Sequence, residues 1–226
     1  MTSLLESAIS ILAPHHCFVC GKESNVLCDA CFFDVFHEAC EVCVLCNKPA
    51  FDGQVCPHCR AQTVLTHVWM AGTYDGPRRQ LIKALKFERC RAAHSVLADA
   101  MLQVLPYQES LVVVPVPTAP RRVRVRGYDQ SVLLARSIAR QRGWMYQPAL
   151  RRRQNDRQVG ASRTRRFRQA ATAFELAHDV MGKHILLVDD VTTSGATLCA
   201  AARVLEESGA ASVQAVVAAK HTLPDR

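Results

Sequence analysis

The chain has 226 residues, of which 49% are hydrophobic and 21% are charged, and its formal net charge is +8. This composition excludes a disordered chain and supplies a full core for one α/β domain of ordinary size with a smaller module beside it. No apolar run is long enough to span a membrane, and residues 4–13 lack the basic start and cleavage site of a secretory leader. We therefore expect a cytoplasmic protein without membrane insertion.

The N-terminal part of the chain carries four Cys-x₂-Cys pairs. They are Cys17 and Cys20, Cys28 and Cys31, Cys43 and Cys46, and Cys56 and Cys59. A Cys-x₂-Cys turn directs two sulfurs at one point, and two such turns complete a tetrahedral thiolate site. A redox dithiol is the rival interpretation, but such motifs usually occur singly, next to a βαβ pattern. The spacing therefore predicts two structural Zn²⁺ ions, which supply much of the folding free energy of this small, polar region.

The spacing leaves the pairing of these turns open. Sequential pairing joins the first turn with the second and the third with the fourth, whereas a cross-braced arrangement joins the first with the third and the second with the fourth. Cys40 precedes Cys43 by three residues and is either a spare thiol or a replacement ligand, and His58 is interpreted as a spacer. We assign residues 1–64 to a zinc-ribbon module and residues 65–226 to a second domain.

The second domain alternates predicted strands with predicted helices. Strands are expected at 67–74, 111–116, 185–188 and 213–219, and helices at 77–87, 92–105, 129–142 and 196–207. In the first helix we expect a buried face made by Leu81, Ile82 and Leu85, with Arg78, Lys83 and Lys86 outside it. Asp129 is the predicted N-cap of the third helix and Gly143 follows its end. The alternation predicts an α/β fold with a mainly parallel sheet flanked by helices.

Positive charge is concentrated in the middle of the chain. Residues 1–66 hold three basic and seven acidic residues, whereas residues 111–170 hold fifteen arginines, no lysine and two acids. The guanidinium group presents a planar fork of donors that matches phosphate oxygens. We therefore expect polyanionic partners for this segment, either phosphorylated small molecules or nucleic acid.

Two arginine-rich loops follow predicted strands, where parallel α/β sheets bind their ligands. The first covers residues 117–130 and offers Pro117, Thr118, Arg121 and Arg126 as anion-binding candidates. The second covers residues 151–169 and offers Arg153, Arg157, Arg163, Arg165, Arg166 and Arg168.

Residues 184–197 are the most informative run of the chain. An apolar strand ends in Asp189 and Asp190, a loop of small residues follows, and a helix begins at Ala196. The loop amides and the helix N-terminus together form an anion site. Two carboxylates beside a phosphate would repel it, unless the ligand also carries hydroxyl groups or Mg²⁺. A ribose 5-phosphate unit has both features.

This run resembles the phosphoribosyl-pyrophosphate (PRPP) motif of type I phosphoribosyltransferases. In that family the two acids hold the ribose 2′- and 3′-hydroxyls, and the loop holds the 5′-phosphate of PRPP, which binds with Mg²⁺. The resemblance assigns PRPP binding to Asp189, Asp190, Val191, Thr192, Thr193, Ser194, Gly195, Ala196 and Thr197. It gives the two acids the catalytic role, makes residues 117–130 a pyrophosphate loop, and makes residues 151–169 a flexible loop that closes over the substrate. Ser194 stands where threonine is usual in the family.

Further motifs occur in one order along the chain. They are Gly-Thr-Tyr-Asp-Gly-Pro and Leu-Ile-Lys-Ala-Leu-Lys-Phe within residues 72–87, Val-Pro-Val-Pro at 114–117, and Arg-Gly-Tyr-Asp-Gln at 126–130. Together with the cysteine pairs and the PRPP motif, they make the whole chain resemble the ComF family of competence and GntX-like proteins. One departure is Gln169, which stands where that family has asparagine after the flexible loop.

The ComF resemblance implies a cytoplasmic role in natural transformation or in the use of DNA as a nutrient. One hypothesis is an enzyme that binds PRPP with Mg²⁺ and transfers its phosphoribosyl group to an unidentified acceptor, releasing pyrophosphate. The alternative is a non-catalytic accessory protein that senses PRPP or binds single-stranded DNA through its arginine-rich face. Proteins of DNA uptake and recombination are implied partners in both cases.

Overall fold

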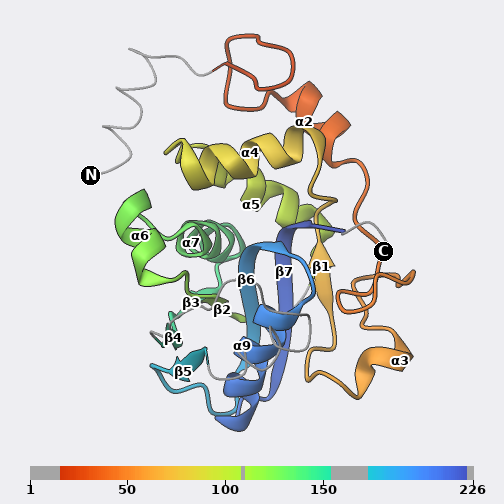
Figure 1. Ribbon diagram of the computed structural model, residues 1–226, viewed down its shortest axis with the longest axis vertical. Helices are drawn as coiled ribbons and strands as arrows, with labels where there is room; N and C mark the ends of the chain where they lie inside the picture. The colour runs from red at the N-terminus through yellow and green to blue at the C-terminus, as the bar shows by residue number, and fades with distance from the viewer. Residues whose placement is uncertain (1–15, 108–109, 154–172, 223–226) are drawn as a thin grey trace.

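The computed structural model describes residues 16–107, 110–153 and 173–222, which form a parallel sheet covered by helices on both faces (Figure 1). The strands of the five-stranded sheet, in spatial order, are β1 (Val68–Met70), β7 (Ser212–Lys220), β6 (His184–Thr192), β2 (Val112–Pro115) and β3 (Met145–Tyr146). All four strand pairings in this sheet are parallel. The predicted α/β fold is confirmed.

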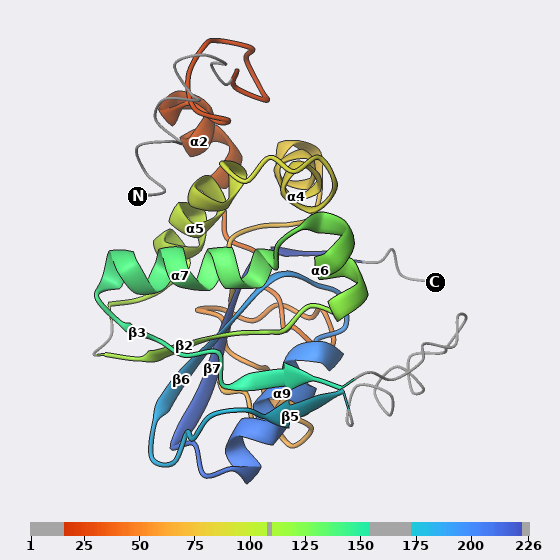
Figure 2. The same cartoon turned by 90° about the vertical axis from the view of Figure 1, so that its left-hand side faces the viewer.

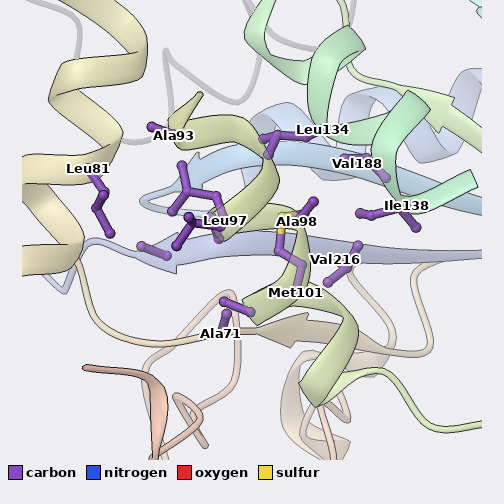
Figure 3. Packing of buried hydrophobic residues seen from close by; sticks show 14 of the residues in the cluster. Ala71, Leu81, Ala93, Leu97, Ala98, Met101, Leu134, Ile138, Val188 and Val216 are labelled. Carbon is purple, nitrogen blue, oxygen red and sulfur yellow. The ribbon is translucent and has the colours of Figure 1, made fainter. Parts of the chain in front are cut away.

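Helices cover the sheet unequally (Figure 2). The first face carries α4 (Gly76–Phe87), α5 (Ala93–Val104) and α7 (Gln130–Arg142), and the second carries α9 (Ala196–Glu207). Successive side chains of a strand point to opposite faces of the sheet. In β6, Leu186 therefore packs in the core of the first face and Leu187 in the core of the second. Figure 3 shows Leu97 and Leu134 in the first of these cores, beside Val188 of β6.

The predicted ends of α7 are confirmed in detail. The side chain of Asp129 accepts a hydrogen bond from the amide of Ser131 at 3.0 Å, as an N-cap does. Gly143 ends the helix with a φ of 67°, a left-handed conformation that glycine adopts without steric cost.

Residues 117–130, predicted to be a loop, contain a helix instead. This helix, α6 (Pro120–Arg126), begins with proline in its first turn and ends at Gly127 in the left-handed conformation. The sequence favours this outcome locally, because proline is pre-organised for the first helical position and glycine for the residue after the end.

The predicted strands also change in length. β6 extends beyond Val188 through both acids to Thr192, because β7 pairs with it as far as Lys220. The strand predicted at 67–74 shortens to β1, and Thr73 keeps one isolated bridge to Lys220. Two short strands, β4 (Leu150–Arg152) and β5 (Phe174–Leu176), form a separate antiparallel pair that the sequence analysis did not predict.

The cysteine-rich region lies along the β1 edge and joins both cores of the sheet (Figure 1). It contains two short helices, α2 (Asp29–Phe36) and α3 (Pro57–Arg60). Leu27 and Phe36 pack with the residues of α4 and α5, whereas Val44 and Leu45 pack with those of α9. The division at residues 64 and 65 stays a prediction, since the apolar contacts continue across it. Among the described helices, none combines the length and apolarity needed to cross a membrane.

Substitution of Asp129 tests how much its hydrogen bonds stabilise the fold. Its carboxylate accepts hydrogen bonds from the amide of Ser131 and from both the amide and the hydroxyl of Thr118. Replacing Asp129 with alanine should lower the free energy of unfolding by about 2 kcal/mol, because a helix cap and a loop tether are lost together. Urea denaturation measures the change. Asp99→Ala is the control, because Asp99 is exposed and accepts a hydrogen bond from Gln141. An equal loss of unfolding free energy in the two variants would contradict the assignment of Asp129 as a helix cap and loop tether.

Candidate functional site

The eight predicted cysteine ligands form two separate sets. The first cysteine cluster is Cys17, Cys20, Cys28 and Cys31, and the second cysteine cluster is Cys43, Cys46, Cys56 and Cys59. Within each cluster the four sulfur atoms lie within 4.8 Å of one another. The pairing is therefore sequential, and Cys40 and His58 belong to neither cluster.

The geometry of both clusters fits Zn²⁺. Sulfur atoms of a tetrahedral thiolate site lie about 3.8 Å apart, because each Zn–S bond is about 2.3 Å. The Sγ atoms of Cys20 and Cys28 are 3.8 Å apart, and those of Cys46 and Cys56 are 3.6 Å apart. Cys43 is fully buried in the second cluster, whereas Cys20 of the first is exposed.

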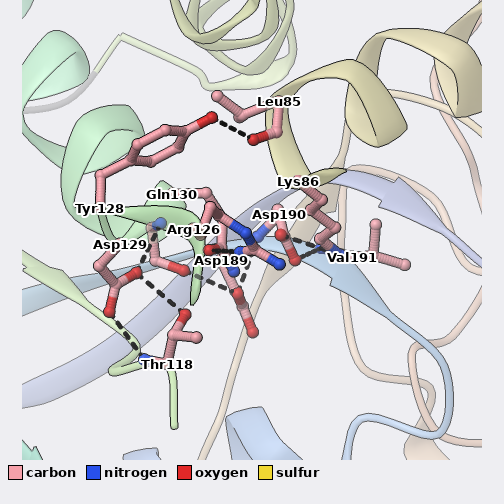
Figure 4. Close-up of polar contacts among 11 residues, drawn as sticks. Leu85, Lys86, Thr118, Arg126, Tyr128, Asp129, Gln130, Asp189, Asp190 and Val191 are labelled. Carbon is pink, nitrogen blue, oxygen red and sulfur yellow. Dashed lines mark hydrogen bonds and ion pairs between the residues drawn. The ribbon is translucent and has the colours of Figure 1, made fainter. Parts of the chain in front are cut away.

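The acid pair lies at the carboxyl end of β6, on the sheet edge where the loops to helices begin (Figure 4). Oδ1 of Asp189 accepts from the hydroxyl of Ser131 at 3.0 Å and from the amide of Asp190 at 2.8 Å. Oδ2 of Asp190 lies 2.9 Å from Nζ of Lys86 and accepts no hydrogen bond from any other described residue. α4 and α7 thus each supply one partner to the acid pair.

The two carboxyl groups share one region of low polarity. Burial and, after it, the negative charge of Asp190 raise the pKa of Asp189 to about 7, against the opposing effect of the Lys86 ammonium group. Near neutral pH the Asp189 carboxyl is therefore divided between its protonated and charged forms. A ligand that donates hydrogen bonds to this carboxyl group would favour the charged form.

The 193–197 loop connects this acid pair to α9. Thr193 is exposed, Ser194 and Thr197 are half-buried, and their hydroxyl groups form no hydrogen bond with the described residues. Gly195 precedes α9 with a φ of 73°. The amides of the first turn of α9 have no partner within the helix, so they and the loop hydroxyls are available to an anion.

The Arg-Gly-Tyr-Asp-Gln motif connects α4, α6 and α7 (Figure 4). The hydroxyl of Tyr128 donates to the carbonyl of Leu85, and Arg126 donates to the side chain of Gln130. Thr118 donates its amide and its hydroxyl to Asp129, at 2.8 and 3.0 Å. Burial raises the pKa of Asp129, and the hydrogen bonds from Thr118 partly reverse this.

The candidate pyrophosphate residues therefore differ in their availability. Arg126 is buried and its guanidinium lies 5.7 Å from the centre of the Phe87 ring, whereas Arg121 is exposed on α6. The carbonyl of Pro117 accepts from Arg152 at 3.3 Å. Thr118 is hydrogen-bonded to Asp129. Of the four candidates in residues 117–130, only Arg121 is therefore available to a ligand without rearrangement.

Most of the second arginine-rich loop lies outside the described residues. Arg153 is exposed and its Nε lies 3.2 Å from a carboxylate oxygen of Glu175 on β5. The remaining candidates from that loop, which are not described, are Arg157, Arg163, Arg165, Arg166 and Arg168.

Three polar residues at the site were not predicted from the sequence. Lys86 was placed outside the buried face of its helix, yet it lies four residues after Ile82 and reaches Asp190. Ser131 is the hydroxyl residue two positions after the predicted N-cap. Lys220 lies at the end of an apolar strand and is fully buried. A single lysine at the end of an apolar run was the feature of the sequence that could have indicated this.

Comparison with known proteins identifies the class of the second domain. The family model for the phosphoribosyl transferase domain matches residues 129–223, which include the acid pair, the 193–197 loop and α7. Among solved structures, the allosteric regulatory enzyme of purine biosynthesis matches 57% of this chain and 26% of its own, at 22% identity and a TM-score of 0.42. With its two cysteine clusters, the chain combines a phosphoribosyl transferase domain with a zinc-ribbon-like region.

Relatives extend the match over most of the chain. The DNA utilization protein YhgH of Salmonella typhimurium is 31% identical over 219 residues, which cover 90% of this chain and 96% of the relative. The competence protein ComFC of Bacillus subtilis is 29% identical over 201 residues, which cover 84% of this chain and 82% of the relative. The chain belongs to the ComF family.

Metal analysis tests the two cysteine clusters. The purified chain should hold two zinc ions, and Cys46→Ser should hold one, because a thiolate of one cluster only is lost. Native mass spectrometry counts the ions. Cys40→Ser is the matched control and should keep both, whereas loss of a zinc ion from it would make Cys40 a ligand.

The raised pKa of Asp189 predicts a pH-dependent penalty on folding. The folded state binds more protons than the unfolded state between the ordinary pKa of 3.8 and the folded value of about 7, so stability from this group falls as pH rises through that window. Asp189→Asn should therefore gain stability relative to the unsubstituted chain as the pH rises from 3.8 to about 7, and should gain no further above it. Urea denaturation at a series of pH values measures this difference. A difference that is constant with pH would contradict the assignment.

Proposed function

We propose that the chain binds PRPP with Mg²⁺ and transfers the phosphoribosyl group to an acceptor, releasing pyrophosphate. The observation that carries this proposal is the acid pair Asp189–Asp190 next to the uncommitted hydroxyls and amides of the 193–197 loop. One end of this site suits the ribose hydroxyls and the other suits the 5′-phosphate. A ligand with phosphate alone would meet two carboxyl groups without compensation.

The 193–197 loop binds the 5′-phosphate in this proposal. Its hydroxyls and the first amides of α9 donate to the phosphate oxygens, and the positive end of the helix dipole adds to the attraction. Gly195 leaves the backbone accessible, because it carries no side chain. The phosphate then fixes the position of the ribose relative to β6.

The acid pair accepts hydrogen bonds from the ribose 2′- and 3′-hydroxyls. Ser131 and Lys86 hold the two carboxyl groups in place before the ligand arrives. This pre-organisation lowers the cost of ordering the site on binding. Mg²⁺ bound with PRPP would neutralise part of the pyrophosphate charge.

The reaction breaks the bond between C1 of the ribose and the pyrophosphate oxygen. The acceptor forms the new bond to C1, and the bonding electrons leave with the pyrophosphate. The residues of the chain contribute by positioning the ribose and by stabilising negative charge on the leaving group. Arg121 on α6 is the exposed candidate for the second of these roles.

The names of the relatives suggest where this chemistry belongs. Those relatives are called a DNA utilization protein and a competence protein. We place the chain among the proteins that take up or use DNA. The acceptor in this context is unidentified, and a nitrogen atom of a nucleobase is the first class to screen.

A second candidate function is binding of single-stranded DNA without catalysis. The observation that favours it is a group of exposed arginines on one short helix, namely Arg121, Arg122 and Arg124 of α6. Guanidinium groups neutralise successive phosphates of a nucleic acid backbone, which makes such binding strongly dependent on salt.

Calorimetric titration of PRPP with Mg²⁺ into the zinc-loaded chain tests the proposal. The chain should bind, and the double variant Asp189→Asn and Asp190→Asn should lose at least about tenfold in affinity, because amide groups are weaker acceptors than carboxylates. Pyrophosphate release in the presence of nucleobases then measures transfer. Asp99→Asn, an exposed change on α5, is the control. No binding of PRPP by the unsubstituted chain would overturn the proposal. If the unsubstituted chain and the double variant both bind single-stranded DNA in a salt-dependent way, the second candidate function is favoured.

A further inference from the structure

A buried lysine connects the second cysteine cluster to the 193–197 loop. Lys220, at the end of β7, has a relative exposure of 0%. Its ammonium group donates to the carbonyl of Val44 at 2.7 Å and to the carbonyl of Thr193. Val44 directly follows a ligand of the second cysteine cluster, and Thr193 begins the loop. One cation therefore holds two backbone segments that are far apart in the sequence.

The direction of the Thr193 carbonyl matters for anion binding. In a trans peptide the C=O and the following N–H point in opposite directions. Because the carbonyl of Thr193 points at Lys220, the amide N–H of Ser194 points away from this buried cation. An ammonium group without matched acceptors is strongly disfavoured in an interior, so the lysine holds its two carbonyls firmly.

A second contact joins the same two segments at Gly195. A β-carbon at this position would lie 2.9 Å from Cδ2 of Leu45 and 3.2 Å from Cγ2 of Val44. The turn between Cys43 and Cys46 is thus packed directly against the loop. Cys199 on α9 also donates to the hydroxyl of Thr63, at 3.3 Å. The start of α9 therefore rests on the segment that carries the second cysteine cluster.

The first cysteine cluster has no such connection among the described residues. Its buried members, Cys17 and Cys31, pack with the core on the opposite face of the sheet, which α4 and α5 cover. The two clusters consequently differ in what their loss would disturb. Only the second touches the structure that we propose to bind phosphate, so the first serves as an internal control.

We infer that Lys220 is a positioning residue and that, with the second cysteine cluster, it holds the 193–197 loop in the conformation that binds phosphate. This inference rests on the proposed function. Zinc at the second cluster then favours anion binding at the loop, and an anion at the loop favours zinc retention. The two effects are equal in free energy, because coupling between two sites is reciprocal.

Zinc release from the unsubstituted chain tests the coupling without any substitution. A colorimetric chelator withdraws zinc in the presence or absence of ribose 5-phosphate, and alkylation followed by peptide mass spectrometry identifies the cysteines that become free. Saturating ribose 5-phosphate should slow release from the second cysteine cluster by about tenfold and leave the first unchanged. Equal rates at the second cluster with and without bound ribose 5-phosphate would overturn the inference.

Lys220→Met tests the cation itself, because methionine keeps most of the side-chain volume and removes the charge. The variant should keep two zinc ions, bind ribose 5-phosphate at least about tenfold more weakly, and lose the protection of the second cluster. Lys83→Met, an exposed change on α4, is the matched control and should behave as the unsubstituted chain. Unchanged binding by Lys220→Met would overturn the role of the lysine.

The two proposals fail in different ways. If the unsubstituted chain binds neither ribose 5-phosphate nor PRPP, the phosphate site is wrong and the inference falls with it. If it binds both but the second cluster is not protected, only the coupling is wrong. Should Lys220→Met not fold, the zinc-release measurement on the unsubstituted chain still decides.

Discussion

The parallel pairing of β6 with β7 is the constraint on which the site depends. It pairs Asp189 with Val217 and continues to Thr192 and Lys220, beyond the apolar part of either strand. Parallel strands present their carboxyl ends at the same edge of a sheet. The pairing therefore brings the acid pair, the start of the 193–197 loop and a buried lysine into one small region.

Electrostatic compensation explains why motifs distant in the sequence converge on the acid pair. Two adjacent carboxyl groups in a region of low polarity repel each other. Lys86 on α4 offsets one of them, and Ser131 at the start of α7 donates to the other. Tyr128 and Asp129 then fix α7 relative to α4 and to residue 118. The Leu-Lys-Phe and Arg-Gly-Tyr-Asp-Gln motifs thus form the structural support of the PRPP motif.

In the cysteine-rich region, the two cysteine clusters and the apolar core are joined in one structure. Each cysteine cluster contributes its buried residues to a different face of the sheet, around the β1 edge. Each cluster brings the sulfur atoms of two Cys-x₂-Cys turns together, and burial against the sheet and its helices fixes the position of these turns. This arrangement gives the second cluster its contact with the 193–197 loop and gives the first cluster none.

The sequence by itself determined the α/β class, the positions of the main helices, the eight cysteines that cluster and the location of the acid pair. These features follow from local periodicity, caps and fixed spacings, which do not depend on distant residues. Tertiary structure alone decided the sequential cysteine pairing, the partners of the acid pair and the burial of Lys220. Each of these features depends on which segments meet in space. The residues next to Lys220 in the sequence, for example, do not indicate which carbonyl oxygens its side chain will contact.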